Sequence, residues 1–66
     1  MEVKVNGESL CCAAGTSLLA LLQTRGLDPA VVVVERNAEI VPQADFAATL
    51  LCAGDALEIM HFVGGG

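Results

Sequence analysis

The chain has 66 residues, a net charge of −5 and 55% hydrophobic residues, with only two aromatic side chains. A chain this short has room for one domain and little space for a deep catalytic cleft, because it buries only about 60% of its unfolded surface. Its three cations, Lys4, Arg25 and Arg36, exclude a nucleic-acid binder, which needs clustered Lys and Arg. No segment approaches the roughly 18 apolar residues of a membrane span or has the pattern of a signal peptide. We therefore expect a cytoplasmic protein with no membrane partner.

The first segment predicts a β-hairpin. Residues 3–5 and 8–10 flank Asn6-Gly7, a dipeptide that favours a two-residue type I′ turn because both residues adopt positive φ. Side chains alternate between the two faces of a strand, and this turn fixes which residues face the core. The predicted inward-facing residues are Val3, Val5, Leu10 and Cys12. The predicted outward-facing residues are Lys4, Ser9 and Cys11.

A helix is predicted next. Thr16 suits its N-cap, and Gly26 suits the left-handed position after its C-terminus, where Leu27 would complete the cap with a hydrophobic contact. Arg25 in the last turn complements the helix dipole. Leucines at helical spacing form the apolar stripe that faces the core: Leu18, Leu19, Leu21 and Leu22.

The second half predicts further strands. Four consecutive valines, 31–34, predict a strand buried on both faces or nearly so, since β-branched residues favour strands. Residues 36–38 form a turn candidate, a short strand follows at 39–41, and residues 43–49 form an irregular or helical connector.

The last segments complete an α+β fold. Leu50 and Leu51 either form a short edge strand or fill the core. Gly54-Asp55 predicts a turn, and residues 56–63 are predicted to form the last strand. A helix between two hairpin-like regions packs across one face of a mixed sheet, with the final strand inside that sheet. We expect residues 1–63 to form this single domain.

The sequence closes on Gly64, Gly65 and Gly66. Glycine packs nothing and loses more backbone entropy on ordering than other residues, so three of them do not help the fold. Fully extended they reach about 10 Å, enough to thread a partner's narrow slot. Glycine-rich ends are also common as flexible segments without a role. We expect residues 64–66 to be a flexible C-terminal tail with an ionised carboxylate on Gly66.

The side chains offer little chemistry of their own. Cys11, Cys12 and Cys52, with His61 as a fourth ligand, lack the Cys-x-x-Cys spacing of a metal site, and their odd number predicts no disulfide framework. No nucleophile lies in a pattern with a base, so we expect neither an enzyme nor a bound cofactor. The Gly66 carboxylate remains, because a carboxylate can attack the α-phosphate of ATP when a partner supplies Mg²⁺ and basic residues.

The order of four segments resembles the ThiS family, the small sulfur carriers of thiamine (thiazole) biosynthesis. These segments are Asn6-Gly7, residues 12–18, residues 37–42 with the pattern Asn-x-x-Ile-Val-Pro, and residues 54–59 leading to the glycines. The resemblance covers essentially the whole chain. It implies a ubiquitin-like β-grasp fold, a mixed sheet of about five strands packed on one main helix.

The resemblance also implies a function. An E1-like enzyme would adenylate Gly66 using ATP and Mg²⁺, a persulfide sulfur donor would convert it to a thiocarboxylate, and thiazole synthase would accept the sulfur. Gly65 and Gly66 would be the functional pair, and Gly64 would extend their reach. The chain would then be a co-substrate of its partner enzymes.

Docking is implied through an apolar patch of the sheet near the last strand. Met60, Phe62 and Val63 are the candidates, because strict alternation along a strand cannot bury all three. Alternatively, Phe62 and Val63 complete the core.

Three other functions stay open from the sequence. The small subunit of molybdopterin synthase resembles this chain in fold and tail but is typically longer. A ubiquitin-like modifier joined to lysines would carry a similar tail. A non-catalytic interaction module would carry its glycines incidentally.

Overall fold

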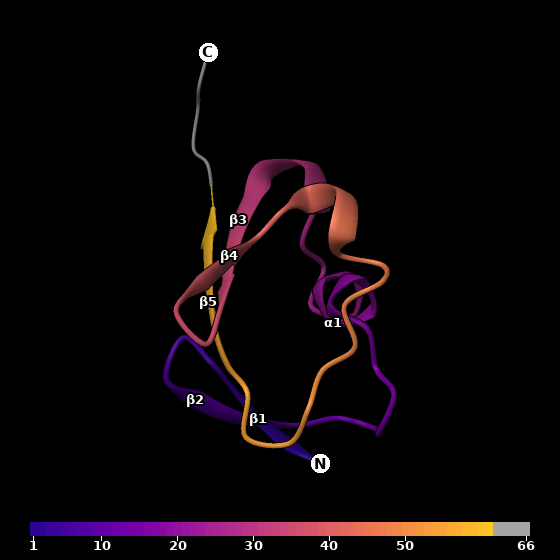
Figure 1. Cartoon of the computed structure of the whole chain (residues 1–66), viewed down its shortest axis with the longest axis vertical. Helices are drawn as coiled ribbons and strands as arrows, with labels where there is room; N and C mark the ends of the chain where they lie inside the picture. The colour runs from indigo at the N-terminus through magenta and orange to yellow at the C-terminus, as the bar shows by residue number, and fades with distance from the viewer. Residues whose placement is uncertain (62–66) are drawn as a thin grey trace.

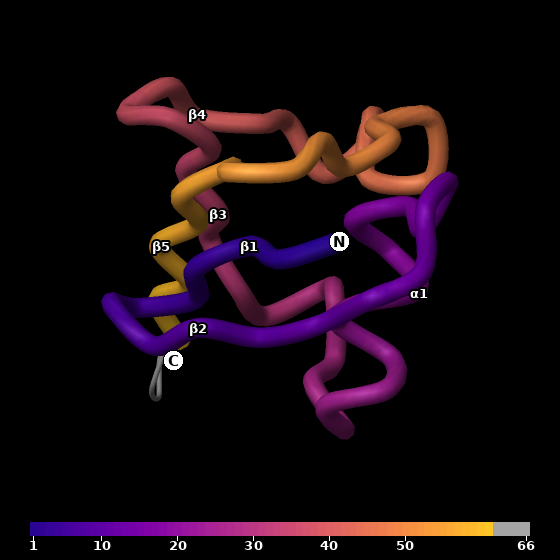
Figure 2. Tube along the Cα trace, turned by 90° about the horizontal axis from the view of Figure 1, so that it is seen from below, coloured from indigo at the N-terminus to yellow at the C-terminus, as the bar shows by residue number. Residues whose placement is uncertain are grey.

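The computed structural model describes residues 1–61, which form a mixed five-stranded sheet with helix α1 (Leu18–Thr24) packed on one face (Figures 1 and 2). The strands are β1 (Glu2–Val5), β2 (Glu8–Cys11), β3 (Val32–Arg36), β4 (Glu39–Val41) and β5 (Ala56–His61). Two 3₁₀ turns complete the elements, η1 (Pro29–Val31) and η2 (Gln43–Asp45). The strand order β2-β1-β5-β3-β4 places β5 inside the sheet, as predicted. Strand β5 is parallel to β1 and antiparallel to β3.

The hairpin has the predicted register. Val5 pairs with Glu8 and Val3 with Leu10, and the turn residues Asn6 and Gly7 have φ of 50° and 84°. A one-residue slip would turn every inward side chain outward, so the turn decides which face of β1 reaches the core.

The N-cap of α1 is Ser17, so the prediction of Thr16 was wrong. The hydroxyl of Ser17 accepts a hydrogen bond from the Ala20 N–H at 3.0 Å, and its backbone is extended, as an N-cap requires. Thr16 instead donates its hydroxyl to the Ala13 carbonyl at 2.6 Å. Ser17 is still extended and forms an isolated bridge with Leu50, so the helix begins one residue later than predicted.

The C-terminal cap of α1 was predicted correctly at Gly26, but Arg25 is the C-cap residue and does not lie in the last turn of the helix. Gly26 has a φ of 71°, and its N–H donates to the Gln23 carbonyl at 3.0 Å. The Leu27 N–H donates to the Leu22 carbonyl at 2.9 Å. These two bonds satisfy carbonyls that the helix leaves free, in the pattern of a Schellman motif.

The valine run is not buried on both faces. Val31 belongs to η1, and β3 begins at Val32. Val32 and Val34 are buried, whereas Val33 between them is only half-buried. Because α1 covers one face of the sheet, the side chains of β3 alternate between the core and the outer face.

Of the two leucines before the last strand, Leu51 is buried in the core, while Leu50 is exposed and forms an isolated bridge with Ser17.

One aliphatic core fills the space between the sheet and α1. Strands β1, β3 and β5 contribute buried residues to it. Strands β2 and β4 pack against it with half-buried residues. The buried residues are Val3, Val5, Leu18, Leu21, Leu22, Val32, Val34, Phe46, Leu51 and Leu57.

Two asparagines hold β5 where its neighbouring strands end. Both have positive φ, 50° for Asn6 after β1 and 51° for Asn37 after β3. The Asn6 side-chain amide accepts from the Ile59 N–H at 2.7 Å and donates to the Ile59 carbonyl at 3.2 Å. The Asn37 side-chain oxygen accepts from the Ala56 N–H at 2.9 Å. Each turn residue therefore continues the hydrogen bonding of β5 beyond the adjacent strand.

Asp55 anchors the start of β5 from a buried position. Its carboxylate, with a side chain only 7% exposed, accepts hydrogen bonds from Arg36 Nε at 2.9 Å, Asn37 Nδ2 at 3.1 Å and the Cys52 N–H at 2.8 Å. Burial alone would raise the pKa of Asp55, but the bonds from Cys52, Asn37 and Arg36 and the charge of Arg36 together lower it.

We predict that Asp55→Asn lowers the free energy of unfolding by roughly 1.5–3 kcal/mol at neutral pH, because a charged acceptor of three donors is lost. The folded-state pKa of Asp55 lies below its ordinary value of 3.8, so its contribution is complete above that pH and is lost as the pH falls through the folded-state pKa. Urea unfolding from pH 2 to 7 should show a shallower acid loss in the variant. Glu8→Gln, an exposed position, is the control; equal acid profiles for Asp55→Asn and wild type would refute the prediction.

We predict that Asn6→Gly keeps the turn, since glycine adopts positive φ freely, but loses both bonds to Ile59. The stability should fall by about 1–2 kcal/mol, and the Ile59 amide should exchange faster with solvent. Asn37→Gly is the comparison variant: it should move the loss of protection to Ala56, and it also removes one donor from Asp55. Unchanged exchange at Ile59 in Asn6→Gly would show that this side chain is dispensable.

Candidate functional site

The end of β5 is the part of the described chain from which the predicted tail continues. Strand β1 pairs with β5 only as far as Leu57, whereas β3 pairs with β5 as far as His61, the last described residue. The Asn6 amide takes the place of β1 beside Ile59. The root of the tail is therefore fixed on both sides up to Ile59 and on one side up to His61. Of the predicted site residues, Phe62, Val63 and 64–66 lie outside the described residues.

Met60 lies on the outer face of the sheet, which α1 does not cover. It is 47% exposed and pairs across the ladder with Val33. Along the same face, Glu58 pairs with Glu35, which in turn pairs with Ile40 of β4, a residue 67% exposed. We call these five residues the outer-face patch.

The sequence analysis missed four members of this patch. Val33 was assigned to a doubly buried strand, and Ile40, Glu35 and Glu58 were not singled out. Successive side chains of a strand point to opposite faces of the sheet, so the sequence of each strand indicated that these side chains face outward. Their gathering around Met60 depends on the strand order, which local pattern does not reveal.

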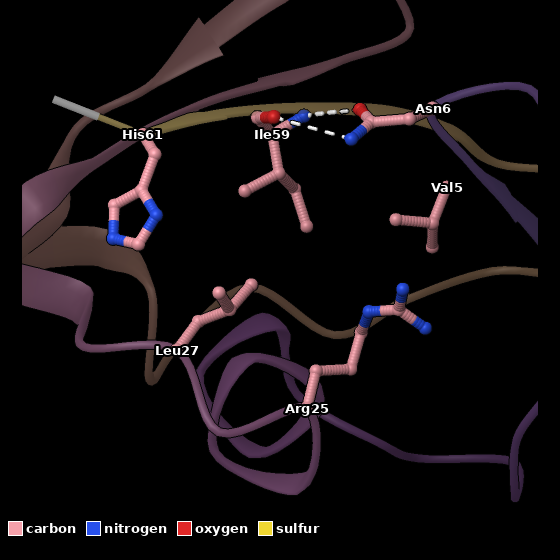
Figure 3. Close-up of a pocket in the computed structure, with 6 residues that line it drawn as sticks. All are labelled: Val5, Asn6, Arg25, Leu27, Ile59 and His61. Carbon is pink, nitrogen blue, oxygen red and sulfur yellow. Dashed lines mark hydrogen bonds between the residues drawn. The ribbon is translucent and has the colours of Figure 1, made fainter. Parts of the chain in front are cut away.

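The inner face carries a second feature near the same strand end, a cavity of about 260 Å³ between β5 and the end of α1 (Figure 3). Helix α1 is only seven residues long, so it leaves the last inward residues of β5 uncovered. Ile59 and His61 point toward Leu27 and Arg25 across this space (Figure 3). The lining residues are Val5, Asn6, Arg25, Leu27, Ile59 and His61.

The remaining chemistry-bearing residues are scattered. Within residues 1–61, no group of three or more His, Cys, Asp or Glu side chains is placed to hold a metal ion. The three cysteines are free, with Cys11 and Cys52 exposed and Cys12 half-buried against the core. Arg36 Nη2 lies 3.4 Å from the Cys52 sulfur. None of the helices in the described part is long and apolar enough to cross a membrane.

Curated relatives match the chain along its length. A thiazole synthase of Paramagnetospirillum magneticum is 44% identical over all 66 residues, and one of Magnetococcus marinus is 41% identical. The chain spans only about a fifth of the length of these two proteins, 20% of each. The sulfur carrier protein ThiS of Bacillus subtilis is 37% identical over 65 residues, which cover 97% of this chain and 98% of the relative.

A solved structure and a family profile agree with these relatives. The crystal structure of the thiamine biosynthesis protein ThiS from Geobacter metallireducens superposes with a TM-score of 0.85 at 33% identity and covers both chains completely. The predicted ubiquitin-like β-grasp fold is thereby confirmed. The profile of the ThiS family matches residues 3–66. The chain therefore belongs to the ThiS family.

Proposed function

We propose that this chain carries sulfur as a thiocarboxylate on Gly66. The observation that supports this most is that the family match runs through the three glycines, which follow a strand held at the centre of the sheet. A fixed strand gives the tail a rigid origin, and glycines keep its carbonyl free of side chains. The group to be modified is then presented by the chain, and the chemistry is supplied by partner enzymes.

The proposed activation uses an E1-like adenylating enzyme with ATP and Mg²⁺. An oxygen of the Gly66 carboxylate attacks the α-phosphorus of ATP, and pyrophosphate leaves. The metal and cationic groups of the partner offset the negative charge of both reactants. The product is an acyl-adenylate whose carbonyl carbon is open to a nucleophile.

Sulfur is then transferred from a persulfide on a donor protein. Its terminal sulfur attacks the carbonyl carbon, and AMP leaves. The product is an acyl disulfide between Gly66 and the donor. A second thiol attacks the donor's own sulfur in this disulfide. The thiocarboxylate leaves, and a new disulfide joins the second thiol to the donor. The chain is a co-substrate in these steps, because its own residues only position the group.

We propose thiazole synthase as the acceptor of this sulfur. Two relatives named thiazole synthase contain a segment 41–44% identical to the whole of this chain, which supports a link between the two proteins. This link favours thiamine biosynthesis over the molybdopterin alternative.

We predict that incubation with the cognate adenylating enzyme, ATP, Mg²⁺ and a persulfide donor replaces one oxygen of the chain by sulfur, as measured by intact mass. Gly65→Ala should slow this conversion about 100-fold, since small displacements of a reacting group are costly. Gly64→Ala, one residue farther from the reacting group, is the matched control and should have a milder effect. An unchanged mass for the wild-type chain, or full conversion after deletion of Gly66, would refute the carrier proposal.

We predict that the gene rescues thiamine-requiring cells that lack their own carrier. The same gene should not rescue cells that lack the carrier subunit of molybdopterin synthase. Growth without thiamine and molybdoenzyme activity are the two measurements. Rescue of the second strain alone would assign the chain to the other pathway.

A further inference from the structure

Two of the four basic side chains of this acidic chain line one cavity. The sequence has eight Asp and Glu residues, and its basic side chains are Lys4, Arg25, Arg36 and His61. Arg25 and His61 both line the cavity between β5 and the end of α1, and no acidic residue of the described chain does. The cavity therefore collects hydrogen-bond donors and positive charge, although the chain carries a net charge of −5.

These two basic groups have no acidic partner among residues 1–61. The ion pair found there joins Arg36 to Asp55. Glu8 lines an adjoining hollow together with Arg25 but forms no salt bridge with it in the described part of the chain. An arginine side chain offers five N–H donors and a histidine ring one or two, so both groups can still bind a ligand.

Apolar side chains lie between the two basic groups (Figure 3). Val5 is buried, while Leu27 and Ile59 are only half-buried. A ligand that covers such apolar surface removes it from water, which favours binding. The volume of about 260 Å³ lies below the roughly 300 Å³ at which pockets for drug-sized ligands begin, so it suits a ligand of about ten non-hydrogen atoms.

Both basic side chains stand on fixed backbone. The N–H of Arg25 donates to the carbonyls of Leu21 and Leu22, both at 3.2 Å, and the bonds of the helix cap follow directly after it. His61 is paired with Val32 of β3. The two positions are therefore set before a ligand arrives, which lowers the entropy lost on binding.

We propose that this cavity binds a small organic anion with an apolar ring. A carboxylate or phosphate on the ring accepts two parallel hydrogen bonds from the Arg25 guanidinium. The ring lies on Leu27 and Ile59, and a polar group at its far end bonds to His61. The site needs no sulfur transfer, so it goes beyond the carrier proposal. Ile59 and His61 belong to the strand that leads to the tail, so the ligand joins the end of that strand to the end of α1.

We predict that 4-hydroxybenzoate, added to the purified chain up to about 10 mM, shifts the NMR amide signals of Asn6, Leu27 and Ile59. A dissociation constant of about 1 mM is expected for a ligand of about ten non-hydrogen atoms. Arg25→Gln should raise this constant about tenfold, and Arg25→Lys should raise it less, because lysine keeps the charge but not the planar fork. Lys4→Gln is the matched control, since Lys4 is exposed on the outer face of β1.

Two further probes test the polar ends of the site. Benzoate lacks the hydroxyl group and should bind several-fold more weakly than 4-hydroxybenzoate, and His61→Ala should abolish this difference. Phenyl phosphate, compared with benzoate, identifies the preferred oxyanion. Each bound probe should also slow the amide exchange of Ile59, because it holds the end of β5 against α1.

Unshifted amide signals at these positions would overturn the proposal. An equal loss of affinity in Lys4→Gln would also overturn it, by assigning binding to net charge. Inorganic phosphate that binds as tightly as phenyl phosphate would show that the apolar surface takes no part. Binding seen only after deletion of residues 64–66 would be equally decisive against it, because the chain's own carboxylate would then be the occupant.

Discussion

The position of β5 at the centre of the sheet is the constraint on which the rest of the structure depends. Its neighbours β1 and β3 both end in tight turns before β5 is fully paired. Unpaired peptide groups inside a sheet are costly, so the remaining groups need other partners. The side chains of Asn6 and Asn37 supply them at Ile59 and Ala56. The same two residues adopt the positive φ that reverses the chain, so each turn also completes the central strand.

The charged network at the start of β5 compensates for the small core. A domain of this size buries limited apolar surface, and its cysteines form no disulfide. Asp55 instead joins two segments: it binds the end of β3 and its turn through Arg36 and Asn37, and it binds the loop before β5 through the backbone of Cys52. The hydrogen bonds from these donors offset the free-energy cost of burying the Asp55 charge. Such a residue is indistinguishable in the sequence from the surface acids around it.

The two faces of the sheet differ in how far their side chains are buried. The inner face builds the core with α1, while the outer face has exposed apolar side chains and the opposed carboxylates of Glu35 and Glu58. Glu58 and Met60 lie on the strand from which the tail continues.

The sequence by itself determined the features that depend on local backbone geometry. Asn6-Gly7 fixed the hairpin register, Gly26 fixed the end of α1, and the order of motifs identified the family. The tertiary structure alone decided which strands lie beside β5, and with them the opposition of Glu35 and Glu58. A positive φ or a strand alternation is specified within a few residues. Strand order and burial depend on segments far apart in the chain, whose pairing is set by the packing of the whole domain.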